Sequence, residues 1–149
     1  MIETTNLLTE ALSQAIETMA FLDILPLEDD LAVPEKTILS EISFTGPKNG
    51  TLQILAGSDF AGIVAENIGA IDDVDNQIRL DAMKELVNVT CGLFFPMIAS
   101  APADVFDMTV PAINSNDNLS QWDEFVSAPD CLVLNVEGHM VAMKLITRE

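Results

Sequence analysis

The residues with the clearest chemical potential lie on one face of a predicted helix. Asp81, Glu85, Asn88 and Gly92 are spaced by four, three and four residues, with Lys84 at the margin. At about 3.6 residues per turn, this spacing places the four within about 60° of one another. Gly92 costs about 1 kcal/mol of helix propensity relative to alanine, and asparagine also disfavours a helix interior. The stripe therefore indicates a surface that another molecule approaches closely; the alternative is the ordinary wet face of an amphipathic helix.

The same residues resemble the signature of a known family. Asp81-x3-Glu85-x2-Asn88, followed after 22 residues by Pro111, looks like the signature of the CheC/CheX chemotaxis phosphatases: Asp or Ser, x3, Glu, x2, Asn, x22, Pro. With each fixed residue at roughly 5% usage, the full pattern is expected by chance in well under about one chain in a hundred. The order of the predicted elements also matches that family across most of the chain.

A second copy of the motif distinguishes the CheC type, in which it lies in the first helix. Here the matching segment is Glu17-Thr18-Met19-Ala20, with alanine where the second asparagine would be needed. One intact site resembles CheX, and that resemblance implies a homodimer.

The resemblance implies hydrolysis of the phosphoaspartate on a phosphorylated CheY-like response regulator. The regulator brings its own Mg²⁺ and lysine, so the phosphatase needs no cofactor of its own and only aims a water in line with phosphorus. Asn88 is assigned to orienting that water, because an amide accepts and donates hydrogen bonds without adding negative charge. Glu85 is assigned to a salt bridge with the regulator's lysine.

The other residues of the pattern receive contact roles. We expect Asp81 and Lys84 to touch the partner, and Gly92 to let the partner's loops approach the helix backbone. Pro111 marks the pattern and has no chemical role that we can derive. The alternative function is a non-catalytic binding or scaffold module of the CheC or flagellar-switch kind, because a fold does not fix a function.

Net charge limits the partners. The 149 residues include 24 Asp and Glu against 6 Lys and Arg, for a formal net charge of −18. Such a surface repels phosphate backbones and anionic lipid, so neither nucleic acid nor a membrane surface is expected as a partner. No segment approaches the ~20 apolar residues that cross a bilayer, and the first residues lack the basic start of a secretory signal. We therefore expect a cytoplasmic protein.

The sequence lacks the residue sets that metal sites and common nucleophilic enzymes need. The soft ligands are Cys91, Cys131 and His139, and no two lie close in sequence, so no metal site is expected. A Ser-His-Asp triad would depend on His139, which is interpreted as an exposed residue at a strand end. Both cysteines are expected to be free thiols. The acidic run 72–75 fits no calcium loop, and its last aspartate is expected to cap the next helix.

Hydrophobic periodicity predicts an α+β fold. Spacings of three and four residues predict three helices, over 5–23, 58–68 and 76–94, the last ended or kinked by Pro96. Alternation predicts five strands, over 36–45, 52–56, 105–110, 131–136 and 139–146, with a polar loop over 114–120. The simplest arrangement is a single domain, 1–149, with helices packed on an antiparallel-rich β-sheet, CheC/CheX-like by resemblance.

Overall fold

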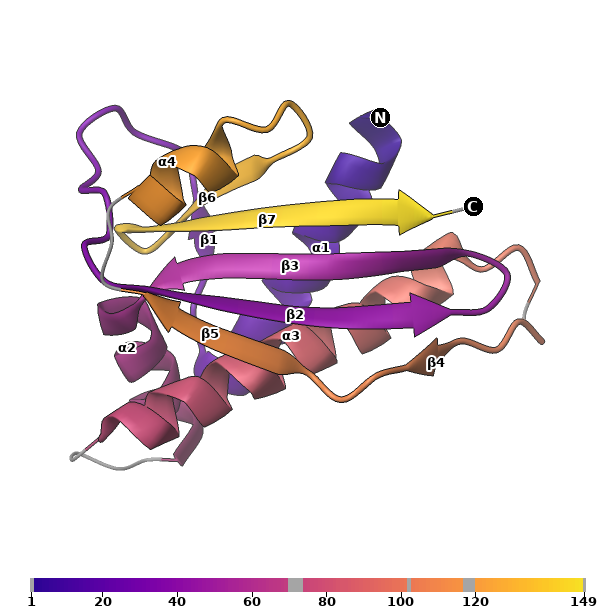
Figure 1. The fold of residues 1–149 in the computed structure, drawn as a ribbon, viewed down its shortest axis with the longest axis horizontal. Helices are drawn as coiled ribbons and strands as arrows, with labels where there is room; N and C mark the ends of the chain where they lie inside the picture. The colour runs from indigo at the N-terminus through magenta and orange to yellow at the C-terminus, as the bar shows by residue number, and fades with distance from the viewer. Residues whose placement is uncertain (1, 70–73, 102, 117–119, 149) are drawn as a thin grey trace.

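An antiparallel sheet of seven strands forms the centre of the computed structural model, which describes residues 2–69, 74–101, 103–116 and 120–148 (Figure 1). The strand order is β1-β6-β7-β3-β2, and both β4 and β5 pair with the remaining edge of β2. The elements in chain order are α1 (Ile2–Ala20), β1 (Ile24–Leu25), β2 (Thr37–Thr45), β3 (Asn49–Gly57), α2 (Ser58–Gly69), α3 (Asn76–Ile98), β4 (Asp107–Met108), β5 (Ala112–Asn116), α4 (Ser120–Val126), β6 (Leu132–Val136) and β7 (His139–Arg148). The predicted α+β class with an antiparallel sheet is confirmed.

One face of the sheet and three helices enclose the main core. Alternate residues of the β2–β3 hairpin, Ile42, Phe44, Leu52 and Ile54 among them, are buried on the side that faces α1, α2 and α3. The helices contribute their apolar stripes to the same cluster: Leu12 and Ile16 from α1, Phe60 and Val64 from α2, and Met83, Leu86, Val87 and Phe94 from α3. Burial of these side chains, each worth about 1.5–3 kcal/mol, fixes α3 against the sheet.

One end of the opposite face of the sheet is covered by the short helix α4, which lies near β6 and the start of β7 in Figure 1. Leu55 and Ala142 point away from the main core because side chains alternate along a strand, and they pack with Trp122 and Phe125 of α4. The polar loop predicted over 114–120 is wrong for the described part of that segment. Residues 114–116 belong to β5, which pairs with Thr37–Glu41 of β2, and Ser120 begins α4.

The edge strand beside β2 is broken at Pro111. Phe44 pairs with Met108 and Glu41 pairs with Ala112, so three edge residues, 109–111, face two residues of β2, 42 and 43. This extra residue is a β-bulge, and proline, which has no N–H to donate to the ladder, is tolerated there. The single strand predicted over 105–110 is therefore wrong: β4 holds two residues, and Val110 is 87% exposed instead of buried.

Helix α3 is longer than predicted. It begins after Asp75, whose side chain accepts a hydrogen bond from the Ile78 N–H at 2.8 Å, as the sequence analysis expected for the last residue of the acidic run. Residues 72 and 73 of that run lie outside the described residues. The helix continues through Pro96 to Ile98, so Pro96 does not end it. Pro96 cannot donate the helical hydrogen bond to the carbonyl of Gly92, four residues earlier.

Candidate functional site

The stripe of α3 lies on the side of the helix that faces away from the main core. Asp81 and Glu85 are exposed and Asn88 is half-buried, whereas Leu86 and Val87 are fully buried on the other side. Helix α3 is held along its length by α1, α2, β2 and β5. The spacing of the Glu85 and Asn88 side chains is therefore that of a regular helix. Glu85 and Asn88 are three residues apart, so their side chains project from adjacent turns of the same face.

Neither Glu85 nor Asn88 has a side-chain partner among the described residues. No hydrogen bond or ion pair connects either group to the rest of that part of the chain, so a carboxylate and a carboxamide stand next to each other with their polar atoms uncommitted. Asp81 differs, since its Oδ1 accepts a hydrogen bond from Gln77 Nε2 at 3.0 Å on the same exposed face. Lys84 is half-buried at the margin of the stripe.

Gly92 extends this stripe toward the C-terminal end of α3. A Cβ placed on Gly92 would meet no atom within 4 Å, so no packing inside the fold excludes a side chain there. The absence of a side chain leaves the backbone of this turn open to a partner. The carbonyl of Gly92 has no helical N–H donor, because residue 96 is a proline. The geometry is compatible with the predicted close approach of a partner at this turn.

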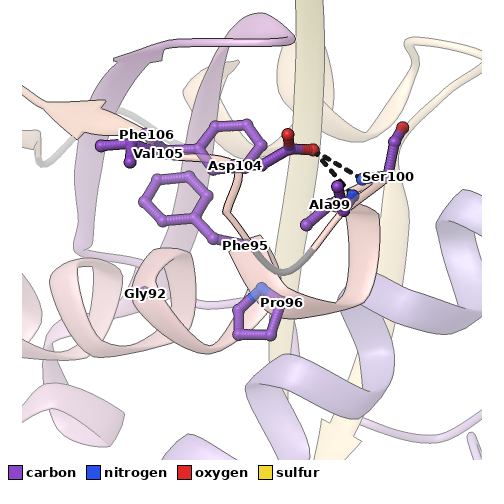
Figure 2. A pocket seen from close by; sticks show the side chains of 9 residues that line it. Gly92, Phe95, Pro96, Ala99, Ser100, Asp104, Val105 and Phe106 are labelled. Carbon is purple, nitrogen blue, oxygen red and sulfur yellow. Dashed lines mark hydrogen bonds between the residues drawn. The ribbon is translucent and has the colours of Figure 1, made fainter.

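A pocket of about 600 Å³ continues the stripe beyond Gly92 (Figure 2). Phe95 and Phe106 form its aromatic wall, with their rings stacked at 4.6 Å and an interplanar angle of 7°. Asp104 Oδ2 accepts hydrogen bonds from the N–H groups of Ser100 (2.7 Å) and Ala101 (3.1 Å), which ties the loop after α3 into the pocket rim. This pocket was not predicted from the sequence, because it depends on the contact between Phe95 and Phe106, two half-buried residues of different segments.

Pro111 does not belong to this pocket. It is half-buried in the bulge of the edge strand, directly before β5, which packs against α3. The bulge explains how a proline is accommodated at this position of the pattern, but it assigns the residue no chemistry.

The first helix offers no second site of the same kind. Glu17 is exposed on α1, but Ala20, at the position of the second asparagine, is fully buried in the main core. Replacing it with a larger polar residue would disrupt the packing.

The remaining reactive groups are of little use to catalysis at the stripe. Cys91 is fully buried, and burial raises the pKa of its thiol to about 12. Both cysteines are free, as predicted. His139 lies at the start of β7, as predicted for a strand end, but it is half-buried and not exposed, with its ring centroid 6.0 Å from that of Phe60. The described residues contain no group of three potential metal ligands and no helix that could cross a membrane.

Several of the solved structures that this fold resembles are chemotaxis proteins. A CheX from Desulfovibrio desulfuricans superposes with a TM-score of 0.72 at 15% identity, covering 98% of this chain and 99% of the other. A CheC-like superfamily protein from Shewanella sp. PV-4 gives 0.71 at 16% identity, with 100% and 99% covered. A chain of the CheX–CheY–BeF3–Mg²⁺ complex from Borrelia burgdorferi gives 0.68 at 17% identity, with 97% of each chain covered.

Sequence comparison adds no closer assignment. No protein-family model matches the chain, and no curated protein sequence matches it. At identities of 15–17% the likeness rests on the course of the backbone over nearly the whole chain. The chain therefore has the fold of the CheX and CheC-like chemotaxis proteins.

Proposed function

We propose that this protein is a CheX-like phosphatase that hydrolyses the phosphoaspartate of a CheY-like response regulator. One observation carries the proposal. The side chains of Glu85 and Asn88 project side by side from α3 without partners among the described residues, on a fold shared with a CheX that was solved with CheY. An ordinary wet helix face has no reason to hold these two groups at the motif spacing.

The reaction needs little chemistry from the phosphatase. Water attacks phosphorus, the bond between phosphorus and the aspartate oxygen breaks, and inorganic phosphate and a free aspartate result. Phosphoryl transfer is accelerated mainly by positioning and charge stabilisation, and the regulator's own Mg²⁺ would supply the latter. The amide oxygen of Asn88 accepts a hydrogen bond from the water and orients it in line with phosphorus, while adding no negative charge.

Glu85 aligns α3 with the active site of the receiver. Its carboxylate pairs with the lysine of the receiver's site, and this pairing sets the distance of Asn88 from the phosphoryl group, since both side chains belong to one helix. Asp81 and Lys84 contact the receiver beside the pair. Gly92 and the aromatic pocket beyond it receive a loop of the partner. The protein acts in the cytoplasm, where receivers are found, and forms a homodimer, for which light scattering would give twice the chain mass of 16.1 kDa.

The test is phosphate release from phosphorylated receiver domains of the same cell. Wild type is expected to accelerate the decay, and Asn88→Ala to abolish most of that acceleration. Asn76→Ala is the matched control, because it makes the same change at an exposed position of the same helix, outside the stripe. Unchanged decay with wild type across those receivers would disprove the proposal.

A scaffold without turnover is the second candidate. The net charge of −18 opposes docking on a receiver's acidic pocket at long range in both cases, and the scaffold stays a candidate because a fold does not fix a function. The two functions separate in a binding assay: a scaffold holds the receiver equally well with wild type and Asn88→Ala, and neither releases phosphate.

A further inference from the structure

A second cavity lies near the N-terminal end of α3, away from the aromatic pocket. It has a volume of about 570 Å³, within the range typical of small-molecule sites. Four segments form its walls: the loop before β2, the junction of β3 and α2, the first turns of α3, and the turn between β6 and β7. In Figure 1 these segments meet at the end of the sheet where α2 begins.

Residue types that are scarce in this chain gather around this cavity. Lys36, Arg79 and His139 all line it, although the chain has only six Lys and Arg and a single His. Glu35 and Asp59 also line the cavity. Among the described residues, however, neither carboxylate forms a salt bridge with Lys36 or Arg79. The formal charges of these four groups sum to zero, but the donors of Lys36 and Arg79 are not taken up by the acids beside them.

The hydrogen-bond donors of Arg79 are only partly used. Its Nη1 donates a hydrogen bond to Ser58 Oγ at 3.3 Å, while its Nε is buried and has no acceptor among the described residues. A guanidinium has more donors than one hydroxyl can occupy, and an unsatisfied buried donor destabilises the fold. Because Nε is closed to solvent and lies against Gly62 of α2, an anion in the cavity would be held by the Nη groups of Arg79, whose remaining donors have no partner among the described residues.

Gly62 of α2 leaves room for the guanidinium of Arg79. A Cβ on Gly62 would meet Arg79 Nε at 3.1 Å and Nη2 at 3.4 Å, so glycine provides the space in which the guanidinium lies against the helix. The N–H of Ser58, the first residue of α2, donates to the carbonyl of Lys36 at 2.8 Å. This bond holds Lys36 beside the start of the helix, whose positive dipole end adds to the field of the two side chains.

We propose that this cavity binds a small molecule that carries a phosphate group. Phosphate oxygens can accept from a guanidinium, a hydroxyl and an ammonium at the same time, which matches Arg79, Ser58 and Lys36. The remainder of the molecule packs against apolar side chains of the same cavity, Val33 and Met140. The site is separate from Glu85 and Asn88 and does not depend on their function.

The test is an NMR titration of the full chain with phenyl phosphate and with inorganic phosphate. Ionic strength is held constant with NaCl at about 0.15 M, where the Debye length is about 8 Å, so that screening of the acidic surface does not imitate binding. Saturable shifts are expected at the amides of residues 58–61 and at the Nε–H of Arg79. Phenyl phosphate is expected to bind more tightly than inorganic phosphate, because it also buries apolar surface.

Matched variants separate a site from a charge effect. Arg79→Gln is expected to weaken binding by about tenfold or more. Lys48→Gln makes the same change in net charge about 30 Å away along β2 and is expected to leave affinity unchanged. If Arg79→Gln does not fold, Lys36→Gln, at an exposed position, is expected to weaken binding several-fold. Titration without saturation, shifts confined to other regions, or equal losses with Lys48→Gln would overturn the proposal.

Discussion

Under the proposed function, Glu85 and Asn88 have different roles toward a receiver, because one carries a charge and the other carries a donor and an acceptor. A charge that pairs with a partner's lysine contributes mainly to binding, and a group that orients the water contributes mainly in the transition state. The two side chains therefore have separable kinetic signatures although they project from adjacent turns of one helix.

Glu85→Gln keeps the size of the side chain and removes its charge. We expect KM for the phosphorylated receiver to rise by about tenfold, with a smaller change in kcat, because the lost pairing sets docking and register. Steady-state phosphate release measures both constants. Glu66→Gln, the same change at an exposed position of α2, controls for the loss of one negative charge; an equal rise in KM there would contradict a specific role for Glu85.

The two cysteines are expected to differ in reactivity. Burial raises the pKa of Cys91 to about 12 and also raises the pKa of Cys131, which is half-buried. Since only the thiolate reacts, a thiol reagent at pH 8 is expected to modify Cys131 slowly and Cys91 only after unfolding. In the folded state the pKa of Cys91 is about 12, above its unfolded value of 9. This difference stabilises the fold below pH 9, and the stabilisation is lost as the pH rises toward 12. Rapid labelling of both thiols in the native protein would contradict this assignment.

At the scale of elements, α3 carries all four residues of the stripe, so the start of this helix is a sensitive point. Asp75→Ala removes the side chain that accepts from the Ile78 N–H and is expected to lower the free energy of unfolding by about 1 kcal/mol. Asp75→Asn retains a capping oxygen and is expected to cost much less. Urea unfolding followed by the fluorescence of the single tryptophan, the buried Trp122, measures the difference; equal losses for the two variants would show that the cap does not stabilise α3.

Periodicity was sufficient to predict α1, the β2–β3 hairpin, α2 and most of α3, because their apolar faces repeat clearly. The stripe from Asp81 to Gly92 was also predictable, since helix geometry alone places those residues together. Three features were not. The break at Pro111 depends on the register of the edge strand against β2. The residues of β5 are mostly polar and show no alternation, because an edge strand gains its order from backbone pairing. The short α4 offers only Trp122 and Phe125, three residues apart, as an apolar face.

At the scale of the molecule, the net charge of −18 opposes the proposed encounter. The acidic pocket of a receiver and an acidic phosphatase repel each other at low salt, and raising the ionic strength shortens the range of that repulsion. We expect the KM for the phosphorylated receiver to fall by several-fold between about 20 and 200 mM NaCl. Spontaneous decay of the receiver at each salt concentration is the control. A KM that rises steeply with salt would show that the docking surfaces attract one another instead.

The central claim is that Asn88 acts on the water and not on binding. Its most direct test is single-turnover decay of a phosphorylated receiver at increasing concentrations of the protein, which separates the plateau rate from the concentration at half-saturation. We predict that Asn88→Ala lowers the plateau by about a hundredfold or more and leaves half-saturation within about twofold of wild type. An unchanged plateau, or a loss confined to half-saturation, would contradict the account.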